Sequence, residues 1–225
     1  QRATEQRFVK WLRSIEPTAE VLFLVGDIFD FWFEYNRVVP KGFVRTLAQL
    51  AHMTDSGIRV VMITGNHDMW VGDYLTTECG IELYTKPQIF TLAGKKILVS
   101  HGDNTNIKGQ PLLKLINAIF RSKTLRVFFS WIIHPDLFLS FGQWWSGKSR
   151  KSHSADYGPE VLDFLVDYAL VYGQKHEIDY FVFGHLHYAD DVKSAQRILF
   201  MGDWHTRPTY VALDNNGEIE LKHYN

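Results

Sequence analysis

The sequence of 225 residues lacks the features that mark several large classes of protein. Its single cysteine, Cys79, excludes an internal disulfide and a cysteine-rich zinc site. The net charge is −1 with neutral histidines, so the bulk charge gives no reason to expect binding to nucleic acid. The first residues show no signal-peptide pattern, and the sequence contains no internal repeat and no low-complexity segment. A globular protein remains, and 46% hydrophobic residues are enough to bury a sizeable core.

A transmembrane helix is not expected either, because no apolar run is long enough. Crossing a bilayer takes about 20 mostly apolar residues. The most apolar region, residues 112–145, is interrupted by five charged side chains: Lys114, Arg121, Lys123, Arg126 and Asp136. We therefore interpret this region as amphipathic helices, which suit contact with lipid or with a membrane surface.

The sequence does contain four short polar motifs, each after an apolar run of strand length. Asp, Asn and His at the ends of neighbouring strands hold divalent metal ions, and a pair of such ions can drive hydrolysis of phosphate esters. The motifs are Gly26-Asp27 after residues 21–25, Gly65-Asn66-His67-Asp68 after residues 60–63, Ser100-His101-Gly102-Asp103 after residues 97–99, and Gly184-His185-Leu186-His187 after residues 180–183.

The order of the predicted elements favours a layered α/β fold. Apolar residues at helical spacing predict helices near residues 8–15, 44–51, 74–79 and 156–174. Apolar runs predict strands at residues 21–25, 58–63, 88–92, 96–99, 180–183, 198–201, 210–213 and 219–222. Strands and helices alternate early and hairpins dominate late, which favours a mixed sheet or two sheets between helices. We expect one domain over residues 1–225, with a helical insertion at residues 109–154.

The first two motifs offer oxygen ligands and a histidine. Asp27 follows an apolar strand, and its two carboxylate oxygens are able to bridge two metal ions; the alternative for a Gly-Asp pair is a turn or helix cap. Asn66 offers an amide oxygen that suits Mn²⁺ or Mg²⁺. His67 is a candidate to hold a phosphate or to donate a proton to a leaving oxygen. Asp68 either orients His67 or caps the next helix.

The other two motifs offer imidazoles. His185 and His187 are predicted to point to the same side of an extended segment, because side chains alternate along a strand. A lone histidine on an apolar face is more often a core residue than a ligand, and this alternative applies to His101, His185 and His187 one by one. The conjunction of four such strand ends argues against it. Carboxylate, amide and imidazole ligands without thiolate favour Mn²⁺, Fe or Mg²⁺, with Zn²⁺ also possible.

These motifs, in this order, are similar to those of the calcineurin-like metallophosphoesterases, and the resemblance covers nearly the whole chain. The stretches Gly26–Trp32 and Met201–Trp204, and a helical insertion after the His-Gly-Asp motif, resemble the UDP-2,3-diacylglucosamine hydrolases of lipid A synthesis. The resemblance implies a four-layer α/β/β/α sandwich with an inserted helical lid. It also implies hydrolysis of the pyrophosphate of UDP-2,3-diacylglucosamine to UMP and 2,3-diacylglucosamine 1-phosphate (lipid X).

The resemblance implies a role for each motif residue. Asp27 is the expected bridge between two divalent metal ions, most suited to Mn²⁺, and a catalytic residue. Asn66, His101 and His185 are expected ligands of one ion, and His187 of the other. His67 matches a catalytic position that contacts substrate phosphate, where many hydrolases of this kind carry arginine and the wider superfamily carries histidine; Asn66 is also expected to contact substrate. Three residues of a basic loop either bind substrate phosphates or are solvated: Lys148, Arg150 and Lys151.

The family pattern opens with a strand that ends in Asp-x-His, which supplies two ligands to the ion that His187 holds. No Asp-x-His precedes Asp27 here, and the first histidine is His52. We expect this strand to lie upstream of Gln1; the alternative is the loss of the second metal site.

The implied partners are a lipid-linked nucleotide sugar as substrate and an anionic membrane surface, without nucleic acid and with the oligomeric state left open. Amphipathic helices of the insertion would form the apolar slot that two acyl chains need, and a basic, aromatic lid would hold the enzyme at the membrane. We expect a cytoplasmic protein at the periphery of the inner membrane, since one cysteine fits a reducing compartment. The alternatives are a metallophosphoesterase for another phosphoester or nucleotide, and a metal-binding scaffold without catalysis.

Overall fold

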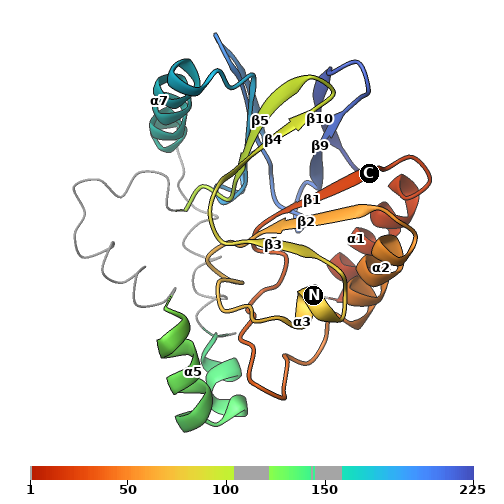
Figure 1. Cartoon of the computed structure of the whole chain (residues 1–225), viewed down its shortest axis with the longest axis vertical. Coiled ribbons are helices and arrows are strands. Elements are labelled where there is room, and N and C mark those ends of the chain that lie inside the picture. The colour runs from red at the N-terminus through yellow and green to blue at the C-terminus, as the bar shows by residue number, and fades with distance from the viewer. Residues whose placement is uncertain (1, 104–121, 143, 145–158) are drawn as a thin grey trace. The chain divides into compact units, whose positions relative to one another are not determined.

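The computed structural model describes residues 2–103, 122–142, 144 and 159–225. The chain forms two compact units, Gln1–Thr85 with Ile107–Lys151 and Lys86–Asn106 with Ser152–Asn225. Both combine helices with sheets, which confirms the predicted α/β class (Figure 1). The stacking of four layers and the organisation as one domain with an insertion at residues 109–154 stay predictions.

The first unit is built on a three-stranded parallel sheet in the order β1-β2-β3 (Figure 1). Its strands are β1 (Val21–Val25), β2 (Arg59–Ile63) and β3 (Glu82–Tyr84). Every side chain of β2 after Arg59 is buried, as expected for a parallel strand that is covered on both faces. Val25 pairs with Ile63, so β1 and β2 end side by side. This register places the two motifs that follow them next to each other.

Two long helices of the first unit lie side by side, and a short one follows β2 (Figure 1). They are α1 (Arg2–Ile15), α2 (Val44–Asp55) and α3 (Tyr74–Thr77). Helix α1 buries Trp11 and Leu12 and ends before Pro17, as its apolar spacing predicts. Arg13 Nε donates to Gln49 Oε1 over 3.0 Å and thereby joins α1 to α2.

The described part of the insertion is helical and packs on the first unit. Helix α5 (Lys123–Ile132) is followed by a second helical segment at residues 135–142. The second segment begins at Pro135, since proline suits the first turn of a helix and not its interior. Phe129, Phe138 and Leu139 pack against a buried aromatic cluster of Phe31, Phe33, Tyr35 and Trp70. In the described parts of the chain, no helix is both long and apolar enough to cross a membrane.

The second unit contains a five-stranded mixed sheet in the order β4-β5-β6-β8-β7. Its strands are β4 (Gln88–Leu92), β5 (Lys95–Ser100), β6 (Tyr180–Phe183), β7 (Asp190–Lys193) and β8 (Arg197–Phe200). The three central strands are parallel, and the pairs Ser100–Phe183 and Phe183–Phe200 end them at one level. Helix α7 (Pro159–His176) packs Leu165 and Ala169 against this sheet.

Two pairs of predicted strands form hairpins in the second unit. Ala93 and Gly94 join β4 to β5 with φ of 47° and 73°, the two positive values of a two-residue type I′ turn. Strands β9 (Thr209–Leu213) and β10 (Ile219–His223) form the second hairpin. The sequence does not predict β3 or β7, because β3 has three residues and β7 is charged, as edge strands often are.

Candidate active site

The first group of predicted site residues lies at the carboxyl ends of β1 and β2. Asp27 Oδ1 accepts the backbone N–H of His67 at 2.9 Å. Asp27 Oδ2 lies 3.9 Å from His67 Nε2, and the two side chains are 13% and 10% exposed. Asn66 lies between Gly65 and His67, both of which contact Asp27. The structure therefore brings Asp27, Asn66 and His67 together within the first unit.

Gly65 is required by the close approach of Asp27. A Cβ atom built on Gly65 would lie 2.7 Å from the backbone nitrogen of Asp27 and 2.9 Å from its Cγ. Contacts shorter than 3.0 Å are essentially never made by real Cβ atoms. Glycine thus allows the carboxylate of one loop to rest on the backbone of the other.

Asp68 braces the same two loops. Its side chain is 0% exposed. Oδ1 accepts the N–H of Gly65 at 2.6 Å, and Oδ2 accepts the N–H of Ile28 at 3.0 Å. The predicted role as a helix cap is wrong, because the next helix begins only at Tyr74, with Asp73 at its N-cap position. The carboxylate instead joins two loops that lie forty positions apart in the sequence, which is a contact that local sequence patterns do not report.

The imidazole of His67 is held in one tautomer. Nδ1 lies 3.1 Å from the carbonyl oxygen of Asp30, which accepts only, so Nδ1 carries the proton and donates it. The carbonyl of His67 in turn accepts the N–H of Trp32 at 2.9 Å. Nε2 is left on the side of Asp27. The ring is therefore oriented by the backbone of residues 30–32 and not by Asp68, the alternative that the sequence suggested.

The second group lies at the ends of β5 and β6. His101 follows Ser100 and is 2% exposed. Its Nε2 lies 3.3 Å from Nδ1 of His185, and the two rings meet edge to face with their centroids 5.0 Å apart. Metal–nitrogen bonds of about 2.0–2.1 Å at tetrahedral or octahedral angles place two ligand nitrogens about 3 Å apart. The spacing of these two nitrogens fits two ligands of one metal ion.

The His-Leu-His segment is not extended, so that prediction is wrong. Strand β6 ends at Phe183, and the N–H of Leu186 donates back to the carbonyl of Gly184 at 2.8 Å. This closes a three-residue turn with His185 at its centre, where φ is 65°. A γ-turn with positive φ is the rarer and more strained form. His187 also has a positive φ, 54°. The directions of both imidazole rings are therefore set by backbone turns and not by the alternation of side chains along a strand.

Positive φ recurs at the predicted ligands. Among the described residues other than glycine, six have positive φ, and three of them are Asp27, His185 and His187. A positive φ costs on the order of 1–3 kcal/mol for a residue other than glycine, and residues in this conformation cluster at functional sites. This strain is an independent sign that these three positions do more than pack.

Asp203 is a further acidic group beside His187, and sequence reasoning gave it no role. Burial opposes the ionisation of Asp203, but hydrogen bonds from Thr206 and from the N–H of His205, with the charge of His187, lower its pKa. The carboxylate of Asp203 therefore interacts electrostatically with this histidine. The signal lay in the Met201–Trp204 stretch.

Three predicted substrate contacts, Lys148, Arg150 and Lys151, lie outside the described residues.

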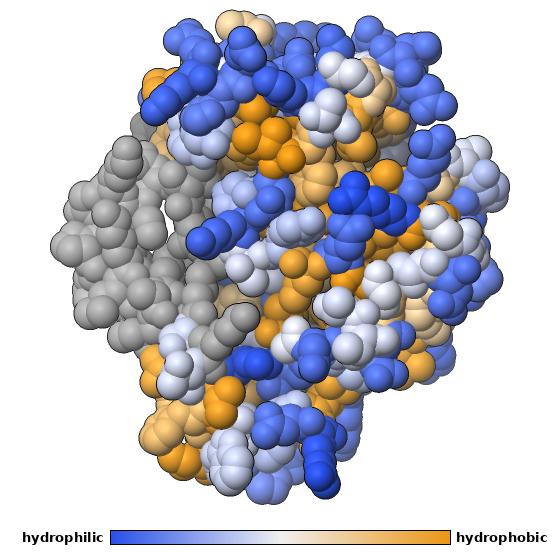
Figure 2. All heavy atoms as spheres, in the orientation of Figure 1, coloured by the Kyte–Doolittle hydropathy of each residue, from blue (hydrophilic) through white to orange (hydrophobic). Residues whose placement is uncertain are grey.

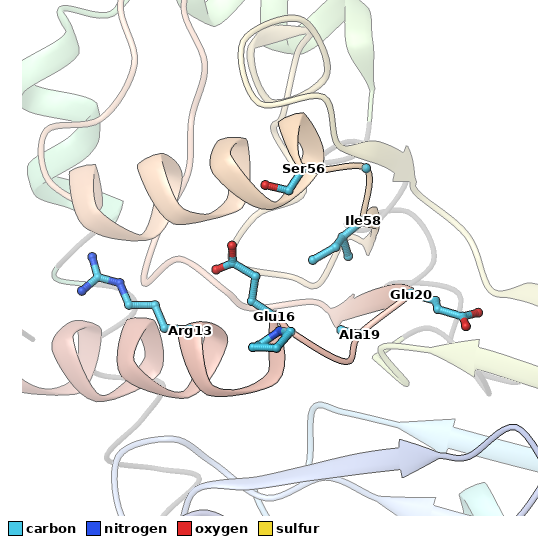
Figure 3. Close-up of a pocket in the computed structure, with 8 residues that line it drawn as sticks. Arg13, Glu16, Ala19, Glu20, Ser56 and Ile58 are labelled. Atoms are coloured by element: carbon cyan, nitrogen blue, oxygen red, sulfur yellow. The ribbon is translucent and has the colours of Figure 1, made fainter.

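A hollow of about 480 Å³ in the first unit contains none of the predicted site residues (Figure 3). It opens at the amino ends of β1 and β2, since Glu20 and Ile58 in its wall directly precede those strands. Glu16, which reaches toward α2 (Figure 3), already accepts a hydrogen bond from Gln49 at 2.7 Å, and His52 Nε2 lies 2.9 Å from its other carboxylate oxygen.

Residues 3–189 match the family described as calcineurin-like phosphoesterase. The chain belongs to this family. Calcineurin-like phosphoesterases act with divalent metal ions, and the carboxylate, amide and imidazole donors of the two groups fit such ions.

Several named relatives resemble this phosphoesterase over most of its length. It is 31% identical to a UDP-2,3-diacylglucosamine hydrolase of Porphyromonas gingivalis, over 93% of this chain and 86% of that protein. It is 28% identical to a UDP-2,3-diacylglucosamine hydrolase of Histophilus somni strain 2336, over 93% of this chain and 89% of that protein. Among solved structures, a Vps29 variant from Entamoeba histolytica aligns with a TM-score of 0.43 and 10% identity, over 96% of this chain and 89% of that chain.

Proposed function

We propose that this phosphoesterase hydrolyses the pyrophosphate bond of UDP-2,3-diacylglucosamine. The observation that carries the proposal is the similarity to relatives of that name, which extends over 93% of the chain and reaches 31% identity. Water adds across one P–O bond of the pyrophosphate: its oxygen goes to phosphorus and a proton goes to the leaving oxygen. UMP and 2,3-diacylglucosamine 1-phosphate (lipid X) are the products.

The ligands that we propose for two divalent metal ions, most suited to Mn²⁺, are the motif residues. They are Asp27 and Asn66 from the first unit, with Asp27 as the bridge, and His101, His185 and His187 from the second. The donor types, the 3.3 Å spacing of the His101 and His185 nitrogens and the positive φ of three ligands support this set. When bound, the metal ions supply charge neutralisation at the phosphates and acidify water.

His67 is proposed to act on the pyrophosphate directly. Because Nδ1 donates to the Asp30 carbonyl, we propose Nε2 as the nitrogen that meets the substrate. We propose that Nε2, when protonated, donates to a phosphate oxygen and gives its proton to the leaving oxygen. The Asn66 amide provides a second contact to phosphate. Lys148, Arg150 and Lys151 are proposed phosphate contacts on the basis of their charge alone.

The exposed apolar face of α5 supports a lipid substrate. It consists of Val127, Phe128, Trp131 and Ile132, which are 43%, 54%, 78% and 65% exposed. Figure 2 shows hydrophobic residues gathered around this helix. Large exposed apolar groups of this kind mark contact with apolar ligands or membranes. We propose that this α5 face meets the acyl chains and the anionic surface of the inner membrane, from the cytoplasmic side.

Release of UMP from UDP-2,3-diacylglucosamine with Mn²⁺ tests the function. The assay uses residues 1–225 and a longer chain that carries the predicted upstream Asp-x-His segment. His101→Ala is expected to keep its circular dichroism spectrum, to bind less Mn²⁺ and to lose more than about 100-fold in turnover, because a buried metal ligand is removed. His223→Ala is the matched control, since His223 is an exposed histidine of β10 in the same unit.

Two results would contradict the proposal. If the longer chain released no UMP, the proposed reaction would be refuted. Activity of His101→Ala close to that of the wild type would remove His101 from the metal site. For the α5 face, Trp131→Ala is expected to weaken sedimentation with vesicles that contain phosphatidylglycerol, and unchanged sedimentation would remove the membrane contact.

A further inference from the structure

Two segments run side by side at the proposed phosphate site: the first is residues 30–34 and the second is residues 67–70. His67 is tied to the first segment by its ring, which donates to the carbonyl of Asp30 at 3.1 Å, and by its carbonyl, which accepts from Trp32 at 2.9 Å. Further along both segments, the N–H of Glu34 donates to the carbonyl of Trp70 at 3.1 Å. The orientation of the imidazole therefore follows the position of the backbone between Asp30 and Glu34.

The side chains of the first segment pack into the inserted helices. Phe31 stands between the two residues that hold His67, and its ring centroid is 5.9 Å from that of Phe138 in the helical segment 135–142. Phe138 is also 4.5 Å from Phe33 and 5.4 Å from Trp70, measured between ring centroids. One side chain of the insertion thus contacts both segments at once.

Gly142 makes this packing possible. A Cβ atom on Gly142 would overlap the ring of Phe31, closer than real Cβ atoms ever approach. Glycine is a poor helix former, so its presence inside a helical segment calls for a local reason. The close approach of Phe31 supplies that reason. The backbone of the insertion itself rests on the ring next to Asp30.

Two further contacts fasten the insertion to the same segment. The hydroxyl of Tyr35 donates to the carbonyl of Ile133 at 3.3 Å. The guanidinium of Arg126, on α5, reaches the surroundings of Gly72, whose N–H donates to Glu34 Oε2 at 2.7 Å. The insertion therefore meets the segment at Phe31, near Glu34 and at Tyr35.

We infer that the inserted helices position His67, through the packing of Phe138 and Gly142 on Phe31 and the two hydrogen bonds that flank Phe31. The inference rests on the proposed function, since it concerns the histidine proposed to meet the phosphate. It goes beyond that function because it gives the insertion a second task. A displacement of these helices, such as entry of acyl chains would cause, is transmitted to the imidazole. Phe138 is thus a positioning residue for the reaction, separate from any contact it makes with lipid.

The test perturbs the packing in two opposite ways. Phe138→Leu removes ring contacts with Phe31, and Gly142→Ala pushes on Phe31 without lowering helix propensity. Leu137→Ala is the matched control, because Leu137 precedes Phe138 in the same segment and is 70% exposed. The first readout is the imidazole NMR spectrum of ¹⁵N-histidine-labelled protein, with the His67 signals assigned by their loss in His67→Gln. Both packing variants are expected to shift these signals, and the control is expected to leave them in place.

The second readout is turnover of bis-p-nitrophenyl phosphate, a soluble phosphodiester without acyl chains. Phe138→Leu is expected to lower kcat by about tenfold, since small misplacements of a reacting group have effects of that size or larger. The double variant His67→Gln with Phe138→Leu is expected to be no slower than His67→Gln alone. Leu137→Ala is expected to turn over at the wild-type rate.

Unchanged His67 signals in both packing variants would overturn the inference. Losses that multiply in the double variant would also overturn it, since Phe138 would then act independently of His67. Failure of the proposed function is distinguishable: UMP would not be released from the lipid substrate, whereas the imidazole spectra and the phosphodiester assay would still report the coupling.

Discussion

Replacing Asp68 by Asn is the sharpest test of the brace between the two loops of the first unit. The carboxylate is fully buried and accepts one N–H on each oxygen, from Gly65 at 2.6 Å and from Ile28 at 3.0 Å. Asparagine keeps the shape but has one acceptor oxygen, so its NH₂ group must face one of the two donors. One hydrogen bond is lost, and one buried N–H is left without an acceptor.

The magnitude follows from those two losses. A hydrogen bond to a charged group contributes about 1.5–3 kcal/mol, and leaving a buried donor unpaired costs about 1–3 kcal/mol. Relief from burying a charge offsets part of this. We expect the free energy of unfolding to fall by about 2–3 kcal/mol, which lowers Tm by roughly 4–12 °C in a chain of this length. Binding of Mn²⁺ is expected to weaken as well, because the brace aligns the loops that carry Asp27 and Asn66.

Thermal unfolding and Mn²⁺ titration of the variant provide the assay. Asp55→Asn is the control, since Asp55 is an exposed aspartate at the end of α2, and it is expected to change stability by less than about 0.5 kcal/mol. An Asp68→Asn protein with the Tm and the Mn²⁺ affinity of the wild type would refute the reasoning. So would an equal effect of Asp55→Asn.

Two further predictions rest on other contacts. Gly65→Ala is expected to reduce activity more than tenfold and to lower Tm, since its methyl group would clash with the carboxylate and the backbone nitrogen of Asp27; kinetic assays and thermal melts check this, and wild-type kcat would contradict it. Asp191 accepts two hydrogen bonds from Arg197, at 2.9 and 2.8 Å, and these lower its pKa below the ordinary 3.8 against the opposing effect of burial. The stability from this pair, about 1 kcal/mol, is therefore present above pH 3.8 and is lost as the pH falls through the lower pKa of the folded state. Urea unfolding of Asp191→Asn is expected to differ from wild type at pH 7 and to converge with it in acid; a difference that persists at the lowest pH would contradict the ion pair.

The sequence predicted the places where strands end with good accuracy. Each of β1, β2, β5 and β6 coincides with an apolar run of the sequence, and each is followed by its polar motif. Such predictions succeed because an apolar run and the residues after it are neighbours in the chain. The prediction failed where local backbone geometry departs from the ideal strand. The turn centred on His185 replaces the alternation that the spacing of His185 and His187 suggested.

The sequence by itself determined the α/β class, the family pattern and the residue types at each strand end, because these are properties of short stretches of chain. Tertiary structure decided which stretches meet. The register of Val25 with Ile63 and of Ser100 with Phe183 makes neighbours of motifs that are far apart in sequence. The hydrogen bonds by which Asp68 joins two loops and the packing of Phe31 on Gly142 depend on the same long-range packing. No local pattern reports such contacts, because they stabilise the protein only once the chain has folded and water has been excluded from between the contacting side chains.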